Sequence, residues 1–266
     1  MHKAPLGVLI IHGFTSSLDC VKDIRPPIER LGLPTRMPVL RGHGAPTPDA
    51  LRGVTWSDWV ADGETALQDL LREAERVTIV GHSMGALVTI FLTADHLDVV
   101  DSIVLAAPAI QLTSPMAPGR PLAFLAPVLT RVLKKWDLPP SYADPSLAAY
   151  DTNYPWAPMD AIRELLTFSR LARQRLPEIR VPTLILQGRN DKTVAPESAE
   201  IVYADIHTPP EDKRIIWFER TDHEMFRDCE RESTIQAVVD YVKKRARLAR
   251  PAADFREGVY SIQEAL

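Results

Sequence analysis

Short runs made mainly of apolar residues alternate along this chain with helix-like segments, most of which are longer. The apolar runs are residues 6–11, 36–40, 77–80, 102–108, 182–187 and 214–218. Runs of this length, rich in β-branched residues, are typical of strands buried on both faces. The helical segments are residues 21–31, 56–74, 86–92, 196–204 and 231–246. The alternation predicts the α/β class, with a mostly parallel sheet of about six strands flanked by helices.

The alternation stops between residues 109 and 180, a segment that we call the excursion. It is rich in proline and large apolar residues, contains no convincing strand and is poor in polar groups that could aim at a substrate. A long insertion between two core strands is typical of a lid or cap. We expect four parts: core 1–108, a mainly helical cap 109–180, core 181–249 and a C-terminal tail 250–266.

Two cap helices are expected in the excursion, the second at residues 161–176. The first carries an apolar stripe made of Leu122, Phe124, Leu125, Val128, Leu129, Val132 and Leu133. Such a stripe is first of all a docking face for the core. Its second interpretation is a lining for an acyl chain, which makes Leu125 and Leu129 candidate substrate-binding residues. The third is weak attachment to a lipid surface through the basic end at residues 131–135.

Composition and charge argue against several classes of partner and site. The 266 residues carry a net charge of −4 with both signs spread along the chain, which predicts no nucleic-acid partner. The two cysteines, Cys20 and Cys229, match neither a disulfide framework nor a metal-ligand spacing, so we expect a cytoplasmic location, no metal and no cofactor. The run at residues 6–11 is too short for a signal peptide, and no stretch is long enough to cross a membrane.

The motif that carries chemistry is Gly81-His82-Ser83-Met84-Gly85, which lies between the strand at 77–80 and the helix at 86–92. G-x-S-x-G in this setting is typical of a nucleophile elbow, a sharp turn that exposes the serine Oγ. Glycines flank the serine because a Cβ there would collide with the neighbouring backbone. The sequence therefore nominates Ser83 as a nucleophile.

A serine hydroxyl needs a base to take its proton. In folds with this elbow, the acid and then the histidine follow the serine along the chain, at the carboxyl ends of strands. His223 follows the strand at 214–218 across a short loop, whereas His96 closes the elbow helix and His207 precedes a strand. His223 is therefore the expected base.

The base in turn needs a carboxylate that orients it. Asp191 follows the strand at 182–187 and is the expected acid. Asp222 adjoins the histidine and Asp205 follows a helix, so neither is placed to reach the far ring nitrogen.

The turn after the first strand, His12-Gly13-Phe14-Thr15, faces the same edge of the sheet as the serine. Acyl transfer forms an oxyanion that needs preorganised N–H donors, usually one from this loop and one from the residue after the nucleophile. We expect the backbone N–H groups of Phe14 and Met84 to form this oxyanion hole, and His12 to hold the loop. For His43, in the next loop, substrate contact stays open, but a structural role in the turn is favoured.

These motifs together resemble the α/β-hydrolase superfamily and, within it, bacterial carboxylesterases and monoacylglycerol lipases. The resemblance is carried by His12-Gly13-Phe14-Thr15-Ser16, Arg41-Gly42-His43-Gly44, Trp56-Ser57-Asp58-Trp59, Gly81-His82-Ser83-Met84-Gly85, the stretch 188–194 and Asp222-His223. It implies the same roles for Ser83, Asp191 and His223, and for the N–H groups of Phe14 and Met84. Relatives often have a second glycine where this chain has Ala86 and a serine where it has Asp222, a charge expected to raise the histidine pKa.

The resulting hypothesis is a serine hydrolase that cleaves small-molecule carboxylic esters with short to medium acyl chains, monoacylglycerols included. The alternatives are thioester, amide or carbon–carbon bond cleavage by the same triad, or a receptor that binds without turnover. Ser83 excludes the aspartate nucleophile of dehalogenase and epoxide-hydrolase relatives.

Overall fold

The computed structural model describes residues 3–115, 117, 120–122, 124 and 133–249. At its centre lies a six-stranded sheet in the order β2-β1-β3-β4-β7-β8, in which every pairing is parallel. The strands are β1 (Ala4–Ile11), β2 (Thr35–Arg36), β3 (Ala74–His82), β4 (Val100–Ala106), β7 (Thr183–Gly188) and β8 (Lys213–Phe218). The expected α/β class with a parallel sheet is confirmed.

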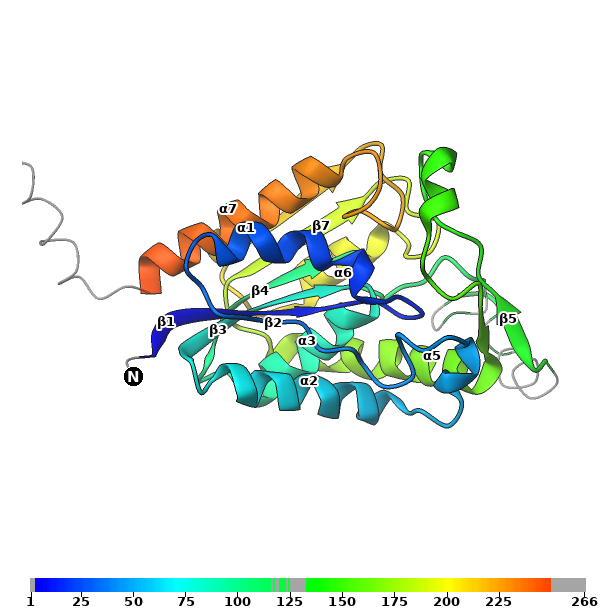
Figure 1. Ribbon diagram of the computed structural model, residues 1–266, viewed down its shortest axis with the longest axis horizontal. Helices are drawn as coiled ribbons and strands as arrows, with labels where there is room; N and C mark the ends of the chain where they lie inside the picture. The colour runs from blue at the N-terminus through cyan, green and yellow to red at the C-terminus, as the bar shows by residue number, and fades with distance from the viewer. Residues whose placement is uncertain (1–2, 116, 118–119, 123, 125–132, 250–266) are drawn as a thin grey trace, which may run out of the picture.

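Helices cover both faces of this sheet (Figure 1). On one face, α2 (Trp56–Leu70), α3 (Met84–Asp95), α5 (Met159–Arg175) and α6 (Glu197–Asp205) share an apolar core with Leu9 and Ile11 of β1. On the other face, α1 (Arg25–Glu29) and α7 (Arg231–Ala249) pack with Leu6, Val8 and Ile10. Alternate residues of β1 thus point to opposite cores, which explains why the strand reads as a continuous apolar run.

Two expected element boundaries are wrong for local reasons. The strand expected at 36–40 ends at Arg36, because Pro38 has no N–H for the sheet and the Leu40 N–H donates to His12 instead. The helix expected at 56–74 ends at Leu70, and Ala74 already pairs with β1. Short 3₁₀ turns connect other elements, at Leu18–Cys20, Lys22–Ile24, Pro48–Leu51, Pro145–Tyr150, Leu176–Glu178 and Pro210–Asp212.

The excursion lies beyond the carboxyl ends of the core strands, at the right of Figure 1. It contains two short antiparallel strands, β5 (Lys135–Asp137) and β6 (Trp156–Pro158), so the expectation of no strand here is wrong. Leu125 and Leu129 lie outside the described residues, as do most of the first expected cap helix and the tail at 250–266. The division into core, cap and tail stays a prediction.

Helix α5, expected as a cap helix, packs one side against the core helices. The Phe168 ring lies 5.7 Å from that of Trp56 on α2 and 5.3 Å from that of Phe91 on α3, measured between ring centroids. Within the described ranges, no helix has both the length and the apolar character needed to cross a membrane.

Candidate active site

Ser83 stands at the junction between β3 and α3 in a strained backbone conformation, with φ 56° and ψ −115°. A positive φ is uncommon for a residue other than glycine and is typical of functional turns. A Cβ at Gly81 would collide with the carbonyl oxygen of Gly85, and a Cβ at Gly85 would collide with that of Ile11. The two glycines thus permit the tight turn that places the serine at the end of the sheet.

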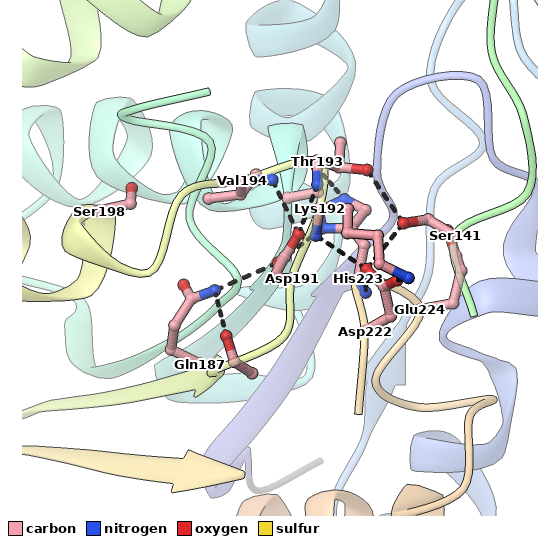
Figure 2. A network of polar contacts seen from close by, with 12 residues as sticks. Ser141, Gln187, Asp191, Lys192, Thr193, Val194, Ser198, Asp222, His223 and Glu224 are labelled. Carbon is pink, nitrogen blue, oxygen red and sulfur yellow. Dashed lines mark hydrogen bonds and ion pairs between the residues drawn. The ribbon is translucent and has the colours of Figure 1, made fainter. Parts of the chain in front are cut away.

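Three predicted residues form one hydrogen-bonded chain. The Ser83 Oγ lies 3.0 Å from the Nε2 of His223, whose Nδ1–H donates to the Oδ2 of Asp191 at 2.9 Å. The second oxygen of Asp191 accepts the backbone N–H groups of Thr193 and Val194, at 2.9 and 2.8 Å (Figure 2). The residues come from the ends of β3, β7 and β8, so the parallel sheet itself brings them together.

The electrostatic surroundings of His223 favour its charged form. Burial acts to lower its pKa, but the carboxylates of Asp191, Glu224 and Asp222 outweigh burial and raise the pKa to about 9. The neighbouring His82 donates from Nε2 to the His223 carbonyl at 3.0 Å, and burial lowers its pKa to about 3. Since His82 stays neutral, it adds no positive charge beside the His223 ring.

The loop after β1 passes directly beside the serine, since a Cβ added to Gly13 would lie 3.1 Å from that of Ser83. His12 accepts the Leu40 N–H at Nε2 and donates from Nδ1 to the Gly13 carbonyl, at 3.0 and 2.8 Å. His43 accepts the Thr15 N–H at 3.1 Å. Burial lowers the pKa of His12 to about 4 and that of His43 to about 3, so both rings are neutral and able to accept.

One expected oxyanion donor, Phe14, lies in this loop, and the other, Met84, directly follows Ser83 at the elbow. Met84 is the first residue of α3, and such an N–H has no acceptor within its own helix. Phe14 lines the cavity that contains Ser83. Their backbone N–H groups stay the predicted donors.

A cavity of about 370 Å³ opens beside Ser83 and His223. One part of its lining is apolar and is called the apolar wall: Leu112, Trp136, Leu138, Met159, Ile162, Leu165 and Leu166. Four of these residues lie on α5: Met159, Ile162, Leu165 and Leu166. The apolar wall offers no charge to a substrate and suits a hydrocarbon chain.

Another part of the lining is a polar network made of Ser141, Tyr142, Asp151, Asn153, Asp222 and Glu224. Ser141 Oγ donates to Asp222 at 2.8 Å, Tyr142 donates to Asp151 at 3.2 Å, and Asn153 Nδ2 donates to Glu224 at 2.8 Å. Four of its members belong to the excursion, so the expectation that this segment is poor in polar groups that could aim at a substrate is wrong. The error arose because these side chains are scattered through residues 141–153 without a motif.

Asp222 is buried, and within the described part of the chain its carboxylate forms no hydrogen bond with the histidine ring. Its Oδ1 accepts the backbone N–H groups of Lys192 and His223, at 2.9 and 2.8 Å, and its Oδ2 pairs with the Lys192 ammonium at 3.1 Å. Sequence reasoning missed Gln187, which donates to Asp191 at 3.2 Å from within β7. It also missed Glu224, although its position directly after His223 was a usable signal.

In the part of the chain that the structure describes, no group of three or more His, Cys, Asp or Glu side chains is arranged to hold a metal ion. Cys20 and Cys229 are both free thiols.

Known proteins resemble the chain over most of its length. The family model described as "Serine aminopeptidase, S33" matches residues 3–230. A thermostable monoacylglycerol lipase of Bacillus sp. (strain H-257) is 25% identical, covering 92% of this chain and 93% of the relative. A carboxylesterase of Bacillus subtilis (strain 168) is 26% identical, covering 90% and 92%.

Solved structures show the same fold. A structure reported for the metagenome-derived lipolytic enzymes LipS and LipT superposes with a TM-score of 0.81 at 26% identity, covering 91% of this chain and 95% of that one. The monoacylglycerol lipase of Paleococcus ferrophilus gives a TM-score of 0.73 at 20% identity, covering 91% and 96%. The latter likeness concerns the fold alone.

Proposed function

This chain belongs to the α/β-hydrolase family described as serine aminopeptidase S33, and we propose that it cleaves carboxylic esters through an acyl intermediate on Ser83. Ester hydrolysis is supported by the similarity of this chain to a monoacylglycerol lipase and a carboxylesterase. The observation that carries the triad assignment is the hydrogen-bonded chain from Ser83 through His223 to Asp191, at the mouth of a cavity with an apolar wall.

The geometry supports a two-step reaction. His223 Nε2 takes the Ser83 proton as the Oγ attacks the ester carbonyl, and the N–H groups of Phe14 and Met84 stabilise the oxyanion. The intermediate then collapses, and His223 gives its proton to the departing alcohol. Water activated by the same histidine hydrolyses the acyl-serine. Asp191 keeps the proton on Nδ1 and stabilises the imidazolium in both steps.

The apolar wall supports short to medium acyl chains as substrates, with monoacylglycerols among them. An apolar pocket discriminates between neighbouring chain lengths by only about 1–3 kcal/mol per methylene, so we expect a graded preference. The excursion acts as the cap that carries this wall. Weak contact with a lipid surface and a cytoplasmic location stay predictions.

The test replaces the nucleophile. Ser83→Ala should fold normally, and its kcat should fall by a factor of about 10⁶, because the triad works as a unit. Hydrolysis of p-nitrophenyl butyrate and covalent labelling by a fluorophosphonate should vanish together. Ser141→Ala, a second serine of the cavity lining, should still be labelled at Ser83. Labelling of Ser83→Ala at another serine would show that the elbow does not carry the nucleophile.

A further inference from the structure

Two loops carry the acid and the base of the triad: the acid loop at residues 189–194 and the histidine loop at residues 219–228. They approach each other closely, since a Cβ on Gly188 at the end of β7 would lie 2.7 Å from the Thr221 carbonyl oxygen. The Asp191 and His223 side chains meet at 2.9 Å across the gap between these loops. The relative position of the two loops therefore decides whether the histidine ring meets its acid.

One carboxylate oxygen joins the two loops beside the triad residues. The Oδ1 of Asp222 accepts the backbone N–H of Lys192, which follows the acid, at 2.9 Å, and the backbone N–H of His223 at 2.8 Å. The Ser141 hydroxyl of the excursion donates to the same oxygen at 2.8 Å (Figure 2). A single atom thus holds the acid loop, the histidine loop and the excursion together.

The Asp222 carboxylate is itself fixed in place. The residue is only 1% exposed, its backbone N–H donates to Asp228 at 2.7 Å, and its Oδ2 pairs with the Lys192 ammonium at 3.1 Å. A buried carboxylate is costly unless hydrogen bonds and an opposite charge compensate for the lost water. Because its partners supply both, the side chain has one well-defined position.

Other links between the two loops lie nearer to the strand ends. The Arg189 N–H donates to the Phe218 carbonyl at 2.9 Å, and the Asn190 side chain donates to the Glu219 carbonyl at 2.8 Å. These contacts fix the points at which the loops leave β7 and β8. The Asp222 contacts act further along both loops, at the base itself.

The charge of Asp222 explains its place less well than these hydrogen bonds do. The carboxylates of Asp191 and Glu224 both do more than that of Asp222 to raise the His223 pKa. The hydrogen bonds of Asp222 go to the backbone of the histidine and not to its ring. Position is therefore the property that this carboxylate controls most directly.

We propose that Asp222 is a positioning residue of the reaction, which fixes the His223 backbone against the acid loop so that the imidazole keeps its hydrogen bonds to both Asp191 and Ser83. It acts through the histidine and takes no part in the bond changes. A displacement of about 1 Å in such a constellation can lower the rate by about 10²-fold. The assignment rests on the proposed ester hydrolysis at Ser83.

Three substitutions separate position from charge. Asp222→Asn keeps an accepting oxygen and removes the charge, Asp222→Glu keeps the charge and moves the oxygen by one methylene, and Asp222→Ala removes both. Each variant is compared with the wild type by kcat and KM on p-nitrophenyl butyrate, at its own optimum pH. The second readout is the downfield proton NMR resonance of the His223 Nδ1–H, which reports its charge-assisted hydrogen bond to Asp191 without any turnover.

We expect Asp222→Ala and Asp222→Glu to lower kcat by roughly 10- to 100-fold, with KM nearly unchanged and the Nδ1–H resonance shifted or lost. Asp222→Asn should keep most of the wild-type kcat and the resonance. Asp222→Glu serves if Asp222→Ala does not fold, as judged by urea denaturation.

Asp101→Ala is the matched control. This buried carboxylate pairs with Arg245 at 2.7 Å and lies near the start of β4, at the opposite end of the sheet from the triad. Its loss should lower stability but leave kcat and the resonance unchanged. An equal fall of kcat in Asp101→Ala and Asp222→Ala would make the effect one of stability alone and overturn the positioning role.

The remaining outcomes separate this inference from the proposed function. Wild-type kcat in both Asp222→Ala and Asp222→Glu overturns the positioning role and leaves ester hydrolysis standing. Full activity in Asp222→Glu with low activity in Asp222→Asn overturns it in favour of charge, and a raised KM with unchanged kcat overturns it in favour of substrate contact. A wild type that does not hydrolyse p-nitrophenyl butyrate contradicts the proposed function, while the resonance still tests whether Asp222 holds the histidine.

Discussion

The carboxyl ends of the core strands and the excursion build the same cavity but are held in place by different means. The backbone fixes the core residues: the elbow sets Ser83, and two backbone N–H groups hold the carboxylate of Asp191. The excursion is fastened mainly by side chains. Tyr154, for example, accepts the Ala45 N–H at 2.9 Å through its hydroxyl. The chemistry thus depends on backbone geometry, while the cavity shape depends on contacts that single substitutions remove.

The largest effect beyond the nucleophile should come from the acid of the core. Asp191→Asn should lower kcat by about 10⁴ while keeping the fold, because it loses the correct histidine tautomer and the stabilisation of the imidazolium. Asp222→Asn, a matched change one residue before His223, should cost far less, since this carboxylate accepts the backbone N–H of His223 and not a ring N–H. The kcat values on p-nitrophenyl acetate rank the two, and the reverse order would make Asp222 the orienting acid.

A smaller effect should come from the fastening of the excursion. The Asp228 carboxylate accepts the Ala143 N–H at 2.8 Å and the Asp144 N–H at 3.2 Å, and also the Asp222 N–H of the histidine loop at 2.7 Å. Asp228→Asn would turn an NH₂ group toward these donors. We expect a loss of about 1–3 kcal/mol in the free energy of unfolding, measured by urea denaturation. An unchanged stability would mean that this carboxylate does not join the two regions.

The smallest effect concerns pH. His223 must be neutral to act as a base, and its pKa is raised to about 9, so kcat/KM should rise with pH along a limb whose midpoint lies above the ordinary 6.5. Asp222→Asn removes a negative charge that favours the imidazolium, which lowers the pKa and moves the limb to lower pH. The profile is measured on p-nitrophenyl acetate for both proteins. A wild-type midpoint below 6.5 would show that burial outweighs the surrounding carboxylates.

How much the sequence predicts follows the same division. The elbow, the order of serine, acid and histidine, and the loop after β1 could be found because each is a local motif tied to a strand end. Glu224, Asn153 and Ser141 could not be found together, because only the tertiary fold brings residues 141–153 to the histidine loop. The strands β5 and β6 span three residues each, too few for any periodicity to show. The role of His43 in holding Thr15 likewise depends on a contact across 28 positions of the chain.

One measurement tests most directly whether the core sets the chemistry and the excursion sets the acyl preference. It is kcat/KM across p-nitrophenyl esters from acetate to laurate, for the wild type, for Asp191→Asn, and for Ile162→Trp and Leu166→Trp on the apolar wall. Asp191→Asn should lower kcat/KM by the same factor for every ester. The tryptophan variants should lower kcat/KM for the longer esters and leave it nearly unchanged for the acetate, so that the preferred acyl chain becomes shorter. A flat wild-type profile, or equal losses on acetate and laurate in both tryptophan variants, would contradict the division between the two regions.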